Sequence, residues 1–226
     1  MLRQAHESVL AQEVGAEHFL VADGFPRPEI DAWKAQHVIL PRAHGDNGNT
    51  PRGIASMLAV AERFDFVAYL DADNWFHADH LRSLIELHAS TGADVCCSLR
   101  TIHARDGTLL QGVQDPKDVD LSHVDTSCYL LEKSAFEYLN IWLTMPRILS
   151  PVCDRVFFRG LAQRRFRVAH SGLATVAFRS WYRVHYLRAG LVPPIDAKGD
   201  TGLEALKWLS TPEGVRACVT RMGFYP

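Results

Sequence analysis

Asp71 and Asp73 are the residues of this sequence whose type and spacing most directly suggest chemistry. They follow the apolar run 66–70, Phe-Val-Ala-Tyr-Leu, which is typical of a buried parallel strand. In an open α/β sheet, ligands bind beyond the carboxyl ends of the strands. Carboxylate oxygens there suit hard cations such as Mg²⁺ or Mn²⁺. The sequence therefore predicts a divalent-cation site at Asp71 and Asp73, and a cation held there could carry a diphosphate.

Two other interpretations of this pattern stay open at the sequence level. Asp118 and Asp120 form a second Asp-x-Asp pair, but they lie in the polar stretch 114–122, which has the composition of a loop. Asp73 or Asn74 could also act as the N-cap of a helix that begins near Ala78. The position of the first pair directly after an apolar strand favours it as the ligand site.

The composition indicates a globular protein with one good core. The chain has 226 residues, of which 47% are hydrophobic and 22% charged, so we expect a single domain over 1–226. A formal net charge of −2 gives no electrostatic reason to expect a nucleic acid partner. The five cysteines are odd in number and show no Cys-x-x-Cys spacing, which indicates neither a disulfide framework nor a zinc ribbon.

The same features predict a reduced, cytoplasmic setting. No apolar stretch approaches the length needed to span a bilayer, and residues 1–7 lack the apolar core of a signal peptide. Any membrane association is therefore expected to be peripheral, at the inner face of the membrane.

Apolar periodicity predicts alternating helices and strands, an order typical of α/β proteins. In the first half the predicted elements are a helix from Leu2, strands at 18–22 and 37–40, a helix after Thr50, the strand at 66–70, a helix from about Ala78 to His88 and a strand at 93–99. In the second half they are a strand at 127–131, helices at 134–142 and 155–163, a strand at 166–170 and a helix at 203–209.

Arg52 is a candidate anion ligand. The loop 42–49 is rich in turn-forming residues, and Thr50 and Pro51 occupy the positions expected of an N-cap and a first helical residue. Arg52 would then lie near free N–H groups at a helix N-terminus, which favour an anion. The alternative is a solvated loop with a surface arginine, because no glycine fingerprint is matched.

Four pieces in order carry a resemblance to a known family. They are a strand ending at Asp23-Gly24, the Asn47-Gly48 turn leading to Arg52, the pair Asp71 and Asp73, and Cys153-Asp154 opening an amphipathic helix that ends in a basic turn. Over residues 2–185 this arrangement resembles the family 2 glycosyltransferases of the GT-A fold.

The resemblance implies a Rossmann-like mixed, mostly parallel sheet flanked by helices. A nucleotide-binding half would span 1–100, an acceptor-binding half 101–190, and a tail 191–226. The implied donor is a nucleotide-diphosphate sugar and the implied acceptor a carbohydrate or glycoconjugate hydroxyl, with transfer that inverts the sugar and depends on Mn²⁺ or Mg²⁺.

Site residues follow from the resemblance one by one. Asp23 would bind the nucleobase, while Arg52 and Asp71 would lie near the nucleotide. Asp73, helped by Asp71, would hold the metal, and Asp154 would be the general base. His185, which follows the last predicted strand, would add a metal ligand.

For three of these residues a structural interpretation remains open. Asp23 before Gly24 could be turn chemistry alone. Asp154 could serve only as a charge favoured by the helix dipole, because the family usually has Glu where this chain has Cys153. Single histidines such as His185, and others on helices or at strand ends, are weak evidence for a metal ligand.

The resemblance also departs from the family at the start of the chain. Family members begin with a strand that precedes the first helix, whereas Met1 falls at the helix itself. A vacant sheet position leaves several alternatives open. The sequence could be a fragment or have a mis-assigned start, another segment or subunit could fill the position, which leaves homo-oligomerisation open, or efficient nucleotide binding could have been lost. The alternative function is a non-catalytic binding or scaffold module of the same fold. A sugar-nucleotide pyrophosphorylase would require a glycine-rich basic loop that the sequence lacks.

Overall fold

The computed structural model describes residues 1–114, 123–199 and 202–226, so Asp118 and Asp120 lie outside the described residues. The chain forms two compact units, each assembled from three separate segments. The first unit comprises Met1–Gly15, Ala68–Leu130 and Arg167–Thr201, and the second comprises Ala16–Val67, Leu131–Phe166 and Gly202–Pro226. The predicted division into a nucleotide half and an acceptor half concerns binding and stays a prediction.

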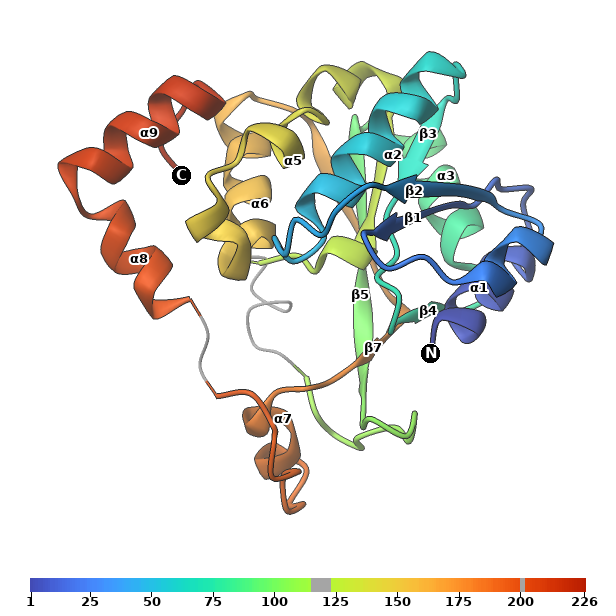
Figure 1. The fold of residues 1–226 in the computed structure, drawn as a ribbon. Helices are drawn as coiled ribbons and strands as arrows, with labels where there is room; N and C mark the ends of the chain where they lie inside the picture. The colour runs from blue at the N-terminus through green and yellow to red at the C-terminus, as the bar shows by residue number, and fades with distance from the viewer. Residues whose placement is uncertain (115–122, 200–201) are drawn as a thin grey trace. The chain divides into compact units, whose positions relative to one another are not determined.

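A five-stranded mixed sheet has the strand order β3-β6-β5-β7-β4 (Figure 1). Its strands are β3 (Phe66–Ala68), β4 (Trp75–Phe76), β5 (Val95–His103), β6 (Tyr129–Glu132) and β7 (Val168–Arg179). β5 and β7 pair in parallel, while β4 runs antiparallel to β7. The α/β fold class with a mixed sheet and flanking helices, predicted from the sequence, is confirmed.

The long strand β7 bulges and then continues to the candidate site. Its register against β5 moves from Cys97↔His170 to Leu99↔Ala174, so extra β7 residues are left unpaired. Gly172 lies in this stretch with a φ of 69°, a conformation that favours glycine. The predicted strand end at His170 is therefore wrong, because β7 pairs with β5 again after the bulge and continues to Arg179.

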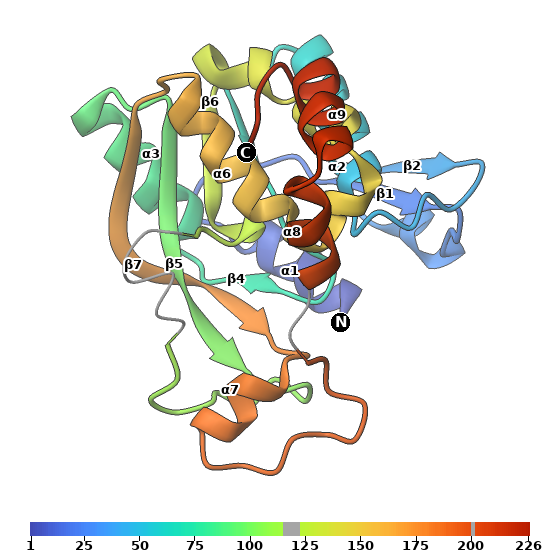
Figure 2. The ribbon, with the colours of Figure 1, turned by 90° about the vertical axis from the view of Figure 1, so that its left-hand side faces the viewer.

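Helices of the first unit pack on this sheet. Its helices are α1 (Leu2–Leu10), α3 (His80–Thr91) and α7 (Arg183–Arg188). α3 lies along β5 and β7 (Figure 2) and buries Leu81 and Leu84. The N-cap of α3 is Asp79, and β4 separates this helix from Asp73. The interpretation of Asp73 or Asn74 as the helix cap is therefore wrong.

In the second unit, β1 (Phe19–Asp23) and β2 (Gln36–Leu40) form a separate parallel pair, joined through the 3₁₀ turn η1 (Pro28–Ala32). Helix α2 (Asn49–Ala61) packs against β1. Gly48, with a φ of 83°, is the N-cap of α2, and the Asp46 carboxylate accepts bonds from the N–H and hydroxyl of Thr50. The helix thus begins earlier than predicted, and Thr50 lies inside it.

The remaining elements of the second unit are the 3₁₀ turns η3 (Lys133–Tyr138) and η4 (Arg147–Val152) and the helices α5 (Ile141–Thr144), α6 (Cys153–Gln163), α8 (Leu203–Leu209) and α9 (Pro212–Met222). The single helix predicted over 134–142 is wrong. Tyr138 turns inward to donate to the carbonyl of Phe157 at 2.9 Å, and Trp142 stacks on the Phe157 ring at 4.5 Å. These core contacts override helical periodicity. The sequence analysis did not predict α9.

All five cysteines are buried and free. Burial raises the pKa of the Cys97 thiol well above its ordinary value, so this side chain is unreactive packing material. None of the helices within the three described ranges combines the length and the apolar character needed to cross a bilayer.

Candidate functional site

Asp71 and Asp73 lie in the turn between β3 and β4, in the first unit. The turn closes where Asn74 N–H donates to the carbonyl of Asp71 at 3.0 Å. The buried hydroxyl of Ser127, in the 3₁₀ turn η2 (Thr126–Cys128), accepts from Asp71 N–H at 3.3 Å and from the Asn74 side-chain amide at 3.1 Å. The two carboxylates therefore project from a turn that is fixed by two segments of the chain.

The charge of Asp73 is poorly compensated. Burial raises the pKa of the Asp73 carboxyl above its ordinary value, and the negative charge of Asp71 raises it further. A hydrogen bond from Trp181 Nε1 to Asp73 Oδ2, 2.8 Å long, opposes these effects without cancelling them. A buried carboxylate beside a second negative charge is costly to ionise. A nearby cation would stabilise its charged form.

Arg179 braces the site from the end of β7. It is 4% exposed, and its guanidinium donates to the carbonyls of Asp73 and Arg105 at 3.0 and 2.5 Å and to the Gln4 side chain at 2.7 Å. Its own backbone N–H donates to Asn74. The oxygens that accept from the guanidinium are neutral, so Arg179 holds the backbone of the turn in place.

Arg105 carries hydrogen-bond donors that are not used. Its guanidinium lies 4.2 Å from the centre of the Trp181 ring, the same ring whose N–H binds Asp73. Nη1 pairs with Asp196 Oδ1 at 2.5 Å, whereas Nε and Nη2 are buried and have no hydrogen-bond partner. These two N–H groups form the side of the guanidinium fork that binds carboxylates and phosphates bidentately. Nothing in the sequence indicated that Arg105 belongs to this site, or that Trp181 contacts Asp73.

Asp125 stabilises the turn indirectly, through Ser127. Its Oδ1 accepts from Ser127 N–H at 3.0 Å, and its Oδ2 pairs with Arg100 Nη1 at 2.8 Å, with both side chains buried. Burial raises the pKa of Asp125, the Arg100 guanidinium opposes that rise, and the charge of Asp71 adds to it. The negative charge of Asp71 thus raises the pKa of both Asp73 and Asp125, and Asp125 was not predicted as a site residue from the sequence.

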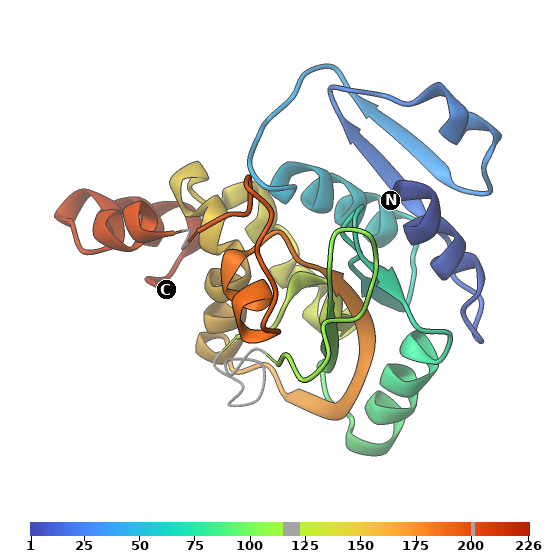
Figure 3. The same ribbon diagram turned by 90° about the horizontal axis from the view of Figure 1, so that it is seen from below.

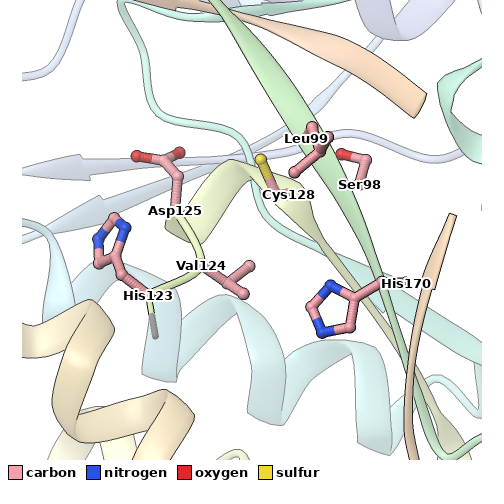
Figure 4. A pocket seen from close by; sticks show the side chains of 7 residues that line it. All are labelled: Ser98, Leu99, His123, Val124, Asp125, Cys128 and His170. Atoms are coloured by element: carbon pink, nitrogen blue, oxygen red, sulfur yellow. The ribbon is translucent and has the colours of Figure 1, made fainter. Parts of the chain in front are cut away.

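A small pocket opens beside η2, on β5 and β7 (Figure 4). Its lining consists of Ser98, Leu99, His123, Val124, Asp125, Cys128 and His170. Burial lowers the pKa of the His170 imidazole, which favours the neutral ring there. None of the site residues predicted from the sequence lines this pocket.

Asp23 lies at the end of β1, in the second unit, and its carboxylate is already satisfied. The backbone N–H of His44 reaches both of its oxygens at 3.0 Å, the His44 ring lies 2.6 Å from Oδ1, and Gly45 N–H donates to Oδ2 at 3.2 Å. Burial alone would raise the pKa of Asp23, but these hydrogen bonds outweigh it and lower the pKa. Asp23 therefore organises the loop that follows β2.

Arg52 and Asp154 have separate surroundings in the second unit. Arg52 donates to the carbonyl of Asn47 at 2.8 Å and lies 5.3 Å from the centre of the Trp142 ring. Asp154 lies in the first turn of α6, where its Oδ1 accepts from the N–H of Arg155 at 2.7 Å. The structure thus confirms the predicted helix positions of both residues, while their binding and catalytic roles stay predictions.

His185 lies inside α7 and is 3% exposed. Its Nδ1 is 2.7 Å from the hydroxyl of Ser180, and its ring packs edge-on against Phe178 and Tyr182. Within the described ranges, no three His, Cys, Asp or Glu side chains group closely enough to hold a metal ion. Asp71 and Asp73 are therefore a two-carboxylate site, and a part for His185 in it stays a prediction.

Comparison with known proteins gives a fold and no close relative. No protein-family model matches the sequence, and no curated protein matches it. Among solved structures, Staphylococcus aureus TarS 1–349 matches with a TM-score of 0.62 at 14% identity, covering 93% of this chain and 62% of that one. TarS is a family 2 glycosyltransferase. This chain shares with TarS an α/β fold with a mixed sheet flanked by helices.

Two further TarS structures match in the same way. The complex of TarS 1–349 with UDP has a TM-score of 0.59 at 13% identity, and the complex with UDP-GlcNAc has a TM-score of 0.58 at 13% identity. This chain covers 62% and 69% of their lengths, respectively. At such low identity the likeness establishes the arrangement of the backbone alone, so each residue of the site must be argued from its own contacts.

Proposed function

We propose that this protein is a metal-dependent glycosyltransferase that moves a sugar from a nucleotide-diphosphate sugar to the hydroxyl of a carbohydrate or glycoconjugate, with inversion. The observation that carries the proposal is the pair Asp71 and Asp73, which follows β3 in a GT-A-like fold and includes a carboxyl whose pKa is raised. A carboxylate kept at such a cost, in a turn braced by Ser127 and Arg179, is expected to have a ligand.

The donor atoms at this turn fit a divalent cation. Asp71 and Asp73 offer carboxylate oxygens, the ligands preferred by Mg²⁺ and Mn²⁺. Trp181 Nε1 donates a hydrogen bond to Oδ2 of Asp73. When bound, such a cation neutralises charge that develops on a departing diphosphate. Asp71 and Asp73 would hold it, and Trp181 would fix the orientation of the Asp73 carboxylate.

Arg105 supplies a second positive charge for the diphosphate in this proposal. Its unused Nε and Nη2 groups match the spacing of two phosphate oxygens. The Trp181 ring fixes the guanidinium on one side while its N–H binds Asp73. A phosphate bound by Arg105 would satisfy two buried donors, each of which costs about 1–3 kcal/mol when it has no partner.

Asp154 is the proposed general base, which takes a proton from the acceptor hydroxyl as that oxygen attacks the sugar carbon. The carboxylate is expected to contribute a factor of about 10²–10⁴ to the rate. Asp23 and Arg52 are proposed to lie near the nucleobase and nucleotide, and His185 near the metal. These four roles rest on the family resemblance, together with the positions of Asp154 at a helix start and Asp23 at a strand end.

The test of the proposed function is a melting screen of the protein with UDP, GDP, CDP and dTDP, each with and without Mn²⁺. A ligand at 100 times its dissociation constant stabilises the folded state by about 2.7 kcal/mol. We expect a Mn²⁺-dependent rise for at least one nucleotide and its loss in Asp73→Ala. Asp65→Ala, which removes a surface carboxylate paired only with Lys133, is the matched control and should keep the rise.

Asp154→Asn tests the base separately from binding. We expect the variant to keep the nucleotide-dependent melting shift and to lose at least about a hundredfold in kcat, measured as release of the nucleoside diphosphate with a panel of saccharide acceptors. Near-normal turnover would remove Asp154 from the base role and leave the rest of the proposal standing.

One observation favours the second candidate, a non-catalytic binding or scaffold module. The oxygens of Asp23, the expected nucleobase ligand, are already engaged by His44 and Gly45. A module of this kind would show no melting shift with any of the four nucleotides, with or without Mn²⁺. Such a result would place the scaffold function ahead of the transferase.

A further inference from the structure

Helix α7 presents apolar side chains to the solvent. His185 and Tyr186 are buried, so the outward face of the helix is the opposite one. At about 100° per residue, Val184 and Leu187 lie at the centre of that outward face. They are 45% and 56% exposed. An apolar stripe on the face turned away from the core is the reverse of the pattern of an ordinary surface helix.

The apolar surface continues into the segment that follows α7. Leu191 is 50% exposed, Val192 is 92% exposed, and Ile195 is fully exposed. Together with Val184 and Leu187, these residues define what we call the α7 face. Figures 1 and 3 show that α7 and this segment lie beyond the ends of β5 and β7, beside the loop that follows β5. Five large apolar side chains in a stretch of twelve residues are more than scattered surface hydrophobics.

The α7 face is held in place and is not a loose tail. Arg183 N–H donates to the carbonyl of Lys198 at 2.8 Å, and Lys198 N–H donates to Trp181 at 2.7 Å, which closes the segment at its base. The Tyr186 hydroxyl donates to the carbonyl of Ser180 at 3.2 Å and accepts from Arg105 N–H at 3.1 Å. The exposure of the apolar side chains is therefore a property of a fixed conformation.

Basic residues surround the α7 face. On the helix, Arg183 and Arg188 lie on either side of the apolar stripe. Lys198 closes the segment, and none of the three forms an ion pair with another residue that the structure describes. Arg188 reaches only the carbonyl of Gln114, at 3.4 Å. The acidic residue of the segment, Asp196, is neutralised by Arg105 at 2.5 Å. Within residues 183–198, all of which the structure describes, three basic side chains thus stand against one acidic side chain.

We propose that the α7 face docks on the surface of a lipid bilayer that contains anionic headgroups. Leu187, Leu191 and Val192 would enter the boundary between headgroups and acyl chains, while the flanking basic side chains reach the phosphates. Charge argues against a second copy of the chain as the occupant, because two such faces would bring like charges together. The proposal does not depend on the proposed transferase activity.

The test is sedimentation of the full chain with vesicles of phosphatidylcholine alone and of phosphatidylcholine mixed with phosphatidylglycerol. We expect at least about tenfold tighter binding to the anionic vesicles, because each basic residue near such a surface contributes about 1 kcal/mol. Rising salt should weaken this preference. Equal binding to both kinds of vesicle, or binding to neither, would overturn the proposal.

A pair of double variants assigns the binding to the α7 face. Leu187→Ser with Val192→Ser should lose at least about tenfold in affinity for the anionic vesicles. The matched control, Leu203→Ser with Val219→Ser, removes two side chains that are 55% and 50% exposed on α8 and α9, and it should bind as the wild type does. Equal loss in both variants, or self-association of the wild type that only the first variant abolishes, would contradict docking on lipid.

Discussion

Asp23 and Asp73 look alike in the sequence and differ in the structure. Each is an aspartate that follows an apolar run, and the family resemblance implies a nucleobase contact for Asp23 and a metal for Asp73. The carboxylate of Asp23 receives hydrogen bonds from His44 and Gly45, and its pKa is lowered. Burial and the negative charge of Asp71 disfavour the ionised form of Asp73 and raise its pKa.

The difference separates a carboxylate that supports the fold from one that is suited to a ligand. A lowered pKa means that the folded state stabilises the charge, so Asp23 contributes to stability at neutral pH. A raised pKa means that the charge costs stability until something compensates for it. Groups whose charge lowers the stability of the folded state are found most often at active sites. By this criterion we propose the turn at Asp71–Asp73, together with the unused donors of Arg105, as the functional centre.

Gly24→Ala tests the structural character of the Asp23 turn and should have the largest effect. Gly24 has a φ of 80°, and a Cβ there would lie 2.3 Å from the backbone nitrogen of Ala43. We expect the free energy of unfolding to fall by about 3 kcal/mol, measured by urea denaturation. Gly15→Ala, where a Cβ meets nothing within 4 Å, is the control. A change below about 1 kcal/mol would show that the turn tolerates rearrangement.

Arg105→Met tests the ligand side of the comparison. The variant should bind a nucleoside diphosphate at least about tenfold more weakly, since a bidentate charged contact is lost, and should bind the nucleoside itself unchanged. Calorimetric titration with UDP and with uridine measures both. Arg216→Met, on the exposed side of α9, should match the wild type. If UDP binds the wild type and the Arg105 variant equally well, the guanidinium fork has no part in diphosphate binding.

The pH dependence of melting should have opposite signs at the two sites, with smaller effects. The folded state raises the pKa of Asp73, so this group's contribution to stability falls as pH rises through its folded pKa. Asp23 contributes stability above its unfolded pKa, and that contribution is lost as pH falls through its lowered folded pKa. Melting curves of wild type, Asp73→Asn and Asp23→Asn over about pH 3 to 7 isolate the two contributions. Differences of the same sign would contradict this account.

The elements that sequence predicted well are those whose pattern is local. The amphipathic α1, the strand that precedes Asp71 and the helix that begins at Cys153 follow from apolar spacing and flanking residues. The single helix predicted over 134–142 is wrong, because contacts of Tyr138 and Trp142 with Phe157, which is distant in the chain, interrupt it. Local periodicity contains no information about such contacts.

The candidate site could be predicted only in part from the sequence, because some of its residues follow a local pattern and others meet only through contacts between distant segments. The spacing of Asp71 and Asp73 and the apolar strand before them indicate a site in the sequence. Arg105 and Trp181 are 76 residues apart in the sequence, and only the packing of the segments after β5 and β7 stacks one on the other. Nothing in the sequence indicates that two nitrogens of one arginine lack partners, or that Asp23 is fully bound while Asp73 is not.

The central claim is that Asp73 is retained for a cation at the expense of stability. The most direct test is the melting temperature of wild type and Asp73→Asn at neutral pH, without ligand and with Mn²⁺ and UDP. Without ligand, we expect Asp73→Asn to melt at the same temperature as the wild type or ~1–3 °C higher. With Mn²⁺ and UDP, we expect only the wild type to gain stability. A variant that melts lower without ligand and keeps the full gain with Mn²⁺ and UDP would contradict it.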